Sequence, residues 1–349
     1  MKTKIIITVF ICFAVLLLGI AIGSVYVPPA DIFNIIRHKL SGAELRGDIK
    51  PSAVAIVWNL RLPRALLAFA AGGALSASGA VMQSVLRNPL ASSYTLGVSS
   101  GASLGACIVI LYGLTLPVLA IFTLPLVGFV FGLGTILLAI SFASRLDGQM
   151  QNNTIILVGM VFSLFVNAIT TLLSALSREH MQRLIFWQMG SFSMKDWPTV
   201  FILAPVTIAG VIFISHFNRE LDMMTFGEEQ AQTMGVNLKK TKWILLITAA
   251  ALTGSAIAFV GVIGFVDLVA PHIIRRFFGS SHRYVIPMSA LFGGAFMVIC
   301  DLAARTLVSP GELPVGAVTA LIGAPFFAYI YFGKKIGTKK TGRGKNADA

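Results

Sequence analysis

The chain has 349 residues, of which 56% are hydrophobic and 12% are charged, and its mean hydropathy is +0.85. Soluble domains carry about 25% charged residues, so this composition excludes an ordinary soluble enzyme and favours a membrane protein. The net charge of +13 at pH 7 does not indicate a nucleic-acid partner, because basic loops on the cytoplasmic side of a membrane account for most of it.

Apolar runs bounded by charge, Pro or Gly predict an all-α polytopic membrane protein, since one crossing needs about 20 residues. No alternating segments of about ten residues indicate a β-barrel. The predicted spans are ten: 5–26, 61–86, 94–111, 116–143, 154–176, 199–217, 243–262, 265–278, 284–307 and 315–332. The first is longer than the core of a usual signal peptide, so we interpret it as a retained span. The eighth is short and contains Pro271, which predicts a broken or partial span.

Ten crossings place both termini on the same side of the membrane. With the termini inside, the inner face holds 17 of the 27 Lys and Arg residues, including those of a basic tail at 333–349. This bias predicts cytoplasmic termini.

Small residues on two spans predict close helix packing in lipid. Gly97, Gly101 and Gly105 repeat every four residues on the third span, and Gly128 and Gly132 do so on the fourth.

A polar stretch at 226–242 interrupts the apolar runs and predicts one or two short helices on the membrane surface. Glu228 and Glu229 stand at its start, and Gly235 breaks it. Its end carries Lys239, Lys240 and Lys242, and this order of charges suits a helix dipole. Such a segment offers a partner protein a binding surface outside the bilayer, and it indicates a membrane protein whose activity is driven by that partner.

No catalytic or metal-binding constellation is visible, so the chain is not predicted to be an enzyme. The five histidines are scattered, and no G-x-x-x-x-G-K-[ST] phosphate loop occurs. Any ATP hydrolysis therefore belongs to another chain. The cysteines at 12, 107 and 300 are interpreted as small buried hydrophobic residues.

Two carboxylates near span ends leave an ion-coupled carrier open but poorly supported. Asp301 can pair with Arg305 one helical turn later, and Asp267 can cap the short eighth span.

Several segments, in chain order, strongly resemble the FecCD family of permease subunits of type II ABC importers. They are Arg-Leu-Pro-Arg at 61–64, the small-residue run at 72–83, Arg-Asn-Pro-Leu-Ala at 87–91, Leu-Gly-Val-Ser-Ser-Gly-Ala-Ser at 96–103, Trp-Gln-Met-Gly-Ser at 187–191, Gly-Phe-Val-Asp-Leu-Val-Ala-Pro-His at 264–272, and segments at 301–305, 312–316 and 319–325. The resemblance covers most of residues 30–333. At Asp267 the chain departs from the family's usual Gly, which puts the local backbone in doubt.

The resemblance implies a ten-span subunit that forms a homodimer or pseudo-dimer with a pathway at the dimer axis, in a bacterial or archaeal cytoplasmic membrane. It implies two cytoplasmic ATPase subunits, which hold ATP and Mg, and an extracytoplasmic binding protein; this chain itself is expected to bind no cofactor. The implied cargo is an iron chelate, first an iron(III)-siderophore, with haem and cobalamin as alternatives.

The resemblance also assigns expected roles to residues. The coupling helices that contact the ATPase include Gly227, Glu228, Glu229, Ala231 and Gly235. Arg61, Arg64 and Arg305 are expected to pair with carboxylates on the binding protein, whose lobes would meet one set from each subunit; pairing within the chain stays open for them. Asn152 and Asn153 align with the cytoplasmic gate, and an ordinary loop stays open there.

Overall fold

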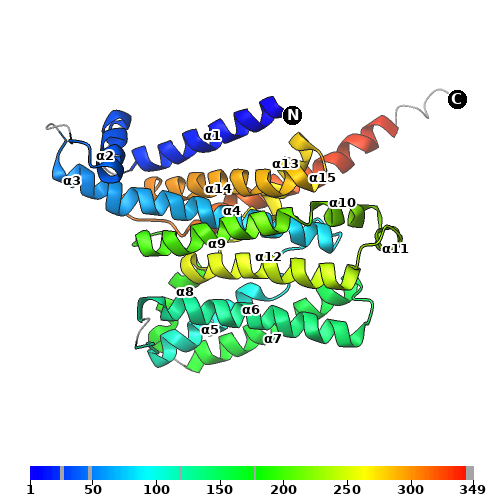
Figure 1. Cartoon of the computed structure of the whole chain (residues 1–349). Helices are drawn as coiled ribbons and strands as arrows, with labels where there is room; N and C mark the ends of the chain where they lie inside the picture. The colour runs from blue at the N-terminus through cyan, green and yellow to red at the C-terminus, as the bar shows by residue number, and fades with distance from the viewer. Residues whose placement is uncertain (24–26, 46–48, 118–119, 177, 343–349) are drawn as a thin grey trace.

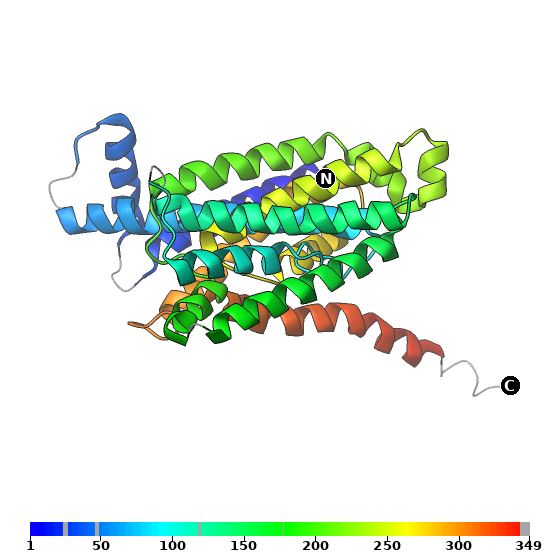
Figure 2. The ribbon, with the colours of Figure 1, turned by 90° about the horizontal axis from the view of Figure 1, so that it is seen from below.

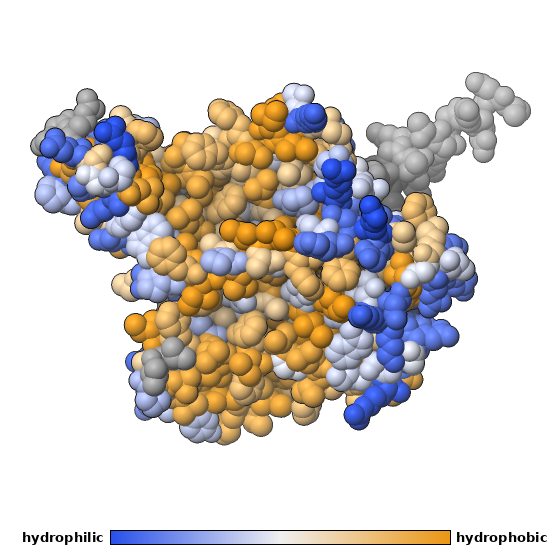
Figure 3. Space-filling view, viewed as in Figure 1, coloured by the Kyte–Doolittle hydropathy of each residue, from blue (hydrophilic) through white to orange (hydrophobic). Residues whose placement is uncertain are grey.

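The computed structural model describes residues 1–23, 27–45, 49–117, 120–176 and 178–342, and all regular structure in these ranges is helical. Long helices lie side by side along one direction (Figure 1), and apolar surface covers their middle while polar residues gather toward the ends (Figure 3). Seven of them are long and apolar enough to cross a membrane: Lys2–Ala21, Pro51–Val85, Ala120–Leu146, Asn152–Leu176, Trp197–Ser215, Leu238–Val260 and His282–Thr306. The all-α polytopic fold is therefore confirmed.

Three further predicted spans are shorter helices, so the count of ten stays a prediction. α5 (Val98–Tyr112) and the Val315–Tyr329 part of α15 are apolar but shorter. α13 (Val266–Phe278) has 13 residues and contains Pro271, as a partial span would. α15 (Val315–Gly342) continues as one helix into the predicted tail, whose last residues, 343–349, lie outside the described ranges.

α4 (Leu62–Val85) is the central helix of the bundle, and nearly all of its residues are buried. It packs against α9 (Trp197–Ser215), α12 (Leu238–Val260), α13 and α14 (His282–Thr306). A Cβ added at Gly72 would meet the Gly293 carbonyl oxygen at 2.2 Å, and one at Gly79 would meet the Asp267 carbonyl oxygen at 1.9 Å. Glycine at these positions lets backbones approach, which is how helices pack without a hydrophobic driving force between them.

The glycine repeats predicted to pack do so between α5 and α6 (Thr123–Leu146). A Cβ at Gly101 would meet the Phe131 carbonyl oxygen at 2.4 Å, and one at Gly132 would meet the Val98 carbonyl oxygen at 2.9 Å. The three cysteines are buried and free, as predicted.

Short helices cover the two ends of the bundle. One end carries α2 (Pro29–Ser41), α3 (Pro51–Ala55) and α8 (Met181–Gln188), and the other carries α10 (Asn218–Phe226) and α11 (Glu228–Thr233) (Figures 1 and 2). The N-terminus and the end of α15 lie toward the second end. The cytoplasmic placement of both termini stays a prediction.

Candidate functional site

Arg61 is placed by an irregular turn at the entrance to α4. Residues 56–61 form a π-helical turn, η1 (Ile56–Arg61), directly before Leu62 and Pro63. Pro63 has no N–H to donate to the preceding turn, so the regular hydrogen bonding of the helix is interrupted directly after this π-helical turn. The Arg61 guanidinium reaches the carboxyl end of α1 (Lys2–Ala21), where Nη1 donates to the Ala21 carbonyl oxygen at 2.9 Å and to that of Ile20 at 3.3 Å.

Arg64, one turn further along, binds two carboxylates at once. Its Nε and Nη2 donate to Asp301 at 3.0 and 2.8 Å, while Nη1 and Nη2 donate to Glu312 at 2.7 and 3.1 Å. The planar guanidinium suits such forked pairing. Asp301 has a side-chain exposure of 2% and Glu312 one of 38%, so the pair runs from the interior to the surface. The hydrogen bond from Arg64 holds the pKa of the Glu312 carboxyl below its ordinary value of 4.5.

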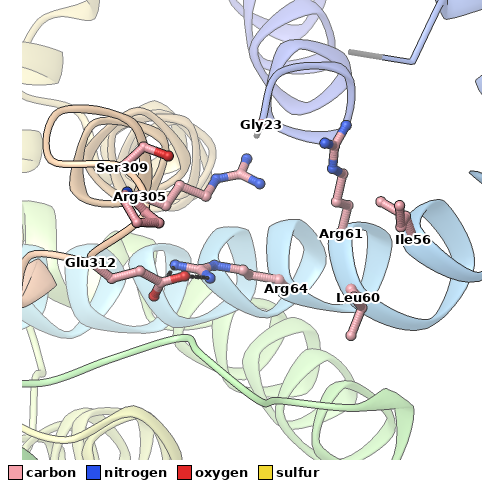
Figure 4. A pocket seen from close by; sticks show the side chains of 9 residues that line it. Gly23, Ile56, Leu60, Arg61, Arg64, Arg305, Ser309 and Glu312 are labelled. Carbon is pink, nitrogen blue, oxygen red and sulfur yellow. Dashed lines mark hydrogen bonds and ion pairs between the residues drawn. The ribbon is translucent and has the colours of Figure 1, made fainter. Parts of the chain in front are cut away.

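Arg305 completes the cluster from α14. Its Nε lies 3.6 Å from Asp301 Oδ2, the predicted pair one turn apart, and its Nη2 donates to the Gly19 carbonyl oxygen. The three arginines and Glu312 line a cavity of about 290 Å³ with Ser309 and Pro310 (Figure 4). Three guanidinium groups face two carboxylates here, so the cluster keeps a net positive charge.

The structure therefore brings together the three arginines predicted to bind a partner, but each of them already bonds within the chain. Pairing within the chain, the alternative left open by the sequence, is observed for Arg64 and Arg305, while Arg61 donates to backbone carbonyl oxygens of α1. This leaves Glu312 as the exposed member and the cavity mouth as the accessible surface of the cluster.

The predicted ATPase-contacting segment, 226–242, holds one short helix, α11, and the first residues of α12, at the opposite end of the bundle; the short helix α10 comes directly before it and ends at Phe226. α10 and α11 meet at Gly227, whose φ of 138° and ψ of 154° favour glycine, and α11 is followed by Gly235 with φ 91°. Ala231 is fully buried, Glu228 is half-buried and Glu229 is exposed. The helical segment begins at Asn218, eight residues before the predicted start at 226.

The interpretation of the three lysines by the helix dipole was wrong. They lie in the first turns of α12, near its amino end, rather than at the carboxyl end of α11. Asn237 caps that helix by accepting from the Lys240 N–H at 3.1 Å. Lys239 and Lys240 are exposed, but Lys242 is fully buried and pairs with Glu228.

The predicted gate residues begin α7 (Asn152–Leu176), at the same end as α10 and α11. Asp147 organises the loop before them: its carboxylate accepts from the N–H groups of Gln149 at 3.0 Å and Gln151 at 2.8 Å. These hydrogen bonds hold the pKa of the Asp147 carboxyl below its ordinary value, and the bond from Gln151 has the largest effect. Asn153 is exposed, whereas the Asn152 Oδ1 atom is buried with no hydrogen-bond partner in the described part of the chain.

Sequence reasoning missed a network that ties α10 to the central helix. His282 donates or accepts at both ring nitrogens, with Nδ1 2.6 Å from Asp222 Oδ1 and Nε2 2.6 Å from Ser84 Oγ. Arg275 Nη2 donates to the same Ser84 oxygen at 2.9 Å. The order Asp–His–Ser resembles a hydrolase triad, but Ser84 is only 5% exposed. A buried hydroxyl cannot reach a substrate, so the network joins helices instead.

Asp267 lies in the first turn of α13 and is 2% exposed. The N-cap of this helix is Phe265, in the left-handed region with φ 70°, so Asp267 is not the cap predicted from the sequence. Its Oδ2 atom has no hydrogen-bond partner among the described residues. No group of three or more potential metal ligands occurs in the described ranges.

Comparison with known proteins agrees with this architecture. A permease protein of an ABC transporter from Bacillus subtilis, YvrB, is 42% identical over 315 residues, which cover 90% of this chain and 89% of the relative. The Fe(3+) dicitrate transport system permease protein FecD of Escherichia coli is 36% identical and covers 79% of this chain and 84% of itself. Other relatives are named for import of hemin in Yersinia pestis, cobalamin in Halobacterium salinarum and molybdate in Haemophilus influenzae.

The fold has a close match among solved structures. A metal-chelate type ABC transporter in an inward-facing conformation superposes with a TM-score of 0.82 at 27% identity, covering 95% of this chain and all of that one. The match confirms the type II importer permease fold, and the names of the relatives identify components of transporters rather than enzymes. The FecCD transport family matches residues 10–332, and the chain belongs to that family as a permease of an ABC importer.

Proposed function

We propose that the chain is the membrane subunit of an ATP-driven importer for an iron(III) chelate, first of all an iron(III)-siderophore. Two copies form a pathway between them in a bacterial or archaeal cytoplasmic membrane, with both termini in the cytoplasm. Two ATPase subunits, which hold ATP and Mg, act from that side. An extracytoplasmic binding protein delivers the chelate from the other.

The observation that carries the proposal is the polar pair α10 and α11 at one end of an apolar bundle. Glu229 is exposed there, while Leu221, Met224 and Ala231 anchor the two helices in the bundle. A short charged segment that is anchored in the bundle offers a soluble ATPase subunit a rigid surface to bind and move. The arginine cluster at the other end supports a second docking surface, because its cavity is positively charged and open at Glu312.

The binding protein would meet Arg61, Arg64 and Arg305 through its own carboxylates. Each arginine is already bonded, so an incoming carboxylate would share a guanidinium or displace Glu312 from Arg64. Exposed ion pairs exchange at little cost, whereas the buried Asp301 pair would stay in place and hold the arginines in position.

Names of relatives favour iron over the other cargoes, since three of the compared permeases are named for iron(III) citrate. Haem and cobalamin are the second candidates and use the same mechanism. The cognate binding protein selects among them, so its ligand tests the cargo. Titration of that protein with a ferric trihydroxamate siderophore, ferric citrate, haemin, cyanocobalamin and molybdate should give tightest binding for a ferric chelate. Tightest binding of haemin, cobalamin or molybdate would reassign the cargo.

An ion-coupled carrier is the rival class, and Asp267 is its best coupling group because it is buried and its Oδ2 atom has no hydrogen-bond partner in the described part of the chain. If ATP drives transport, uptake does not respond to a proton gradient, and Asp267→Asn should not change this. Loss of gradient-driven uptake in this variant would support the carrier instead.

A further inference from the structure

Lys242 stands out because burial and helix position both disfavour its charge. The side chain has no exposed surface, and it lies in the second turn of α12, where the positive end of the helix dipole opposes a cation. An uncompensated buried ammonium group is costly, so its partners determine whether it is tolerated.

The partners of Lys242 come from two segments far apart in the sequence. Nζ donates to Glu228 Oε2 at 2.9 Å, at the start of α11, and to the Met150 carbonyl oxygen at 2.7 Å, in the loop before α7. One nitrogen atom thus joins the segment expected to contact the ATPase to the loop expected to form the gate.

The loop on the gate side is held in an unfavourable backbone conformation. Met150 has φ 52°, in the left-handed region that is unfavourable for a residue other than glycine. Its side chain is fully buried, and its N–H donates to the Asp147 carbonyl oxygen at 3.0 Å. The bond from Lys242 uses the carbonyl group that this conformation presents.

On the other side the loop is connected rigidly to α7. Asp147 accepts from Gln151 N–H, and the Gln151 carbonyl oxygen accepts from Ile155 N–H at 3.1 Å in the first turn of α7. Only Gln151 separates Met150 from Asn152. A displacement of the Met150 carbonyl therefore moves the amino end of α7.

We propose that Lys242 is the positioning residue that couples α11 to the gate loop, so that movement of α11 by the ATPase shifts residues 147–153. The proposal rests on the proposed function and specifies how its two ends communicate within one subunit. A buried apolar side chain would often be no less stable than an ion pair. An ionic link, however, connects Glu228 and Met150 through directional bonds that packing alone does not provide.

The test uses the permease assembled with its cognate ATPase and binding protein in lipid nanodiscs. A spin label on Gln151→Cys reports the loop, because Gln151 is exposed while the three native cysteines are buried. The variants are Lys242→Met and Glu228→Gln, with Lys239→Met as the matched control on the exposed side of the same helix start.

In the unchanged protein and in Lys239→Met, trapping the ATPase with ATP and vanadate should alter the spectrum at residue 151. Lys242→Met should lose this change and import roughly tenfold less ferric siderophore per ATP hydrolysed, a size typical of coupling between sites. Basal ATP hydrolysis and ATPase association should stay as in the control. Because both changes cut the same link, adding Glu228→Gln to Lys242→Met should have no further effect on the spectrum at residue 151.

A spectrum at 151 that responds fully to nucleotide in Lys242→Met would overturn the proposal, and so would additive effects of the two substitutions. If Lys242→Met does not assemble, Glu228→Gln takes its place, with ATPase association measured alongside because Glu228 is itself an expected ATPase contact; a full nucleotide response at residue 151 in this variant would overturn the proposal. Absence of ATP-driven uptake by the unchanged complex would instead refute the proposed function, while the nucleotide response at 151 would still test the link.

Discussion

Arg64→Gln should destabilise the protein by about 3 kcal/mol, because it leaves the Asp301 carboxylate buried without its main partner. Breaking a buried pair by removing one member costs about 3–5 kcal/mol. The cost of Arg64→Gln should lie at the lower end of this range, because the Arg305 guanidinium remains 3.6 Å from Asp301. Loss of the contact to Glu312 adds at most about 1 kcal/mol, since that carboxylate is more than a third exposed.

A double-mutant cycle separates the pair from the rest of the site. Asp301→Asn combined with Arg64→Gln removes the uncompensated charge, so the double variant should be more stable than the sum of the single effects by about 2 kcal/mol. The free energy of unfolding is measured by titration with SDS in mixed micelles and followed by helical circular dichroism. Arg183→Gln, on the exposed face of α8, is the control and should change stability by less than about 0.5 kcal/mol.

Strict additivity of the two substitutions would refute the reasoning, as would a cost for Arg64→Gln no larger than that of the control. Affinity for the binding protein is measured separately on the folded variants. It reports docking, whereas the unfolding titration reports the internal pair.

Three further predictions concern packing, pH and the gate. Gly79→Ala should prevent correct assembly of α4 with α13, because the added Cβ meets a carbonyl oxygen at 1.9 Å; Gly134→Ala, with open space around it, should express and melt like the unchanged protein. Because the pKa of Glu312 is lower in the folded protein than its ordinary value of 4.5, the ionised carboxylate stabilises the fold above pH 4.5. This stability is lost as the pH falls through the folded-state pKa, and the free energy of unfolding should fall with it. In Glu312→Gln this pH-dependent fall should be absent. Cysteines at 152 or 153 should cross-link between two subunits and block uptake until reduced, and failure in every nucleotide state would place the gate elsewhere.

Much of the fold was predictable from sequence because long apolar runs have few structural options in a membrane. The exceptions have local causes. α2 was not predicted because it is amphipathic rather than a long apolar run, and it buries only Ile32 and Ile35 on one face. Its signals were present, since Pro29 begins the helix and Gly42, with φ 68°, ends it.

Whether a contact in the candidate sites could be predicted depends on how far apart its two residues lie along the chain. Arg305 and Asp301 are one turn apart, so their pairing could be predicted. Arg64 and Asp301 are separated by 237 positions, and no local spacing reveals that contact. Lys242 was predicted at the end of a polar surface segment, and lysines are seldom fully buried; only the packing of α11 and the gate loop around it reveals its burial.

Uptake by proteoliposomes tests the central claim most directly. The chain is reconstituted with its cognate ATPase, ATP is enclosed on the ATPase side, and the binding protein loaded with radioactive ferric siderophore is added on the other. The account predicts uptake that requires ATP, the binding protein and an ATPase able to hydrolyse ATP, with no response to a proton or sodium gradient. Uptake that continues with an inactive ATPase, or that follows an ion gradient, would contradict it.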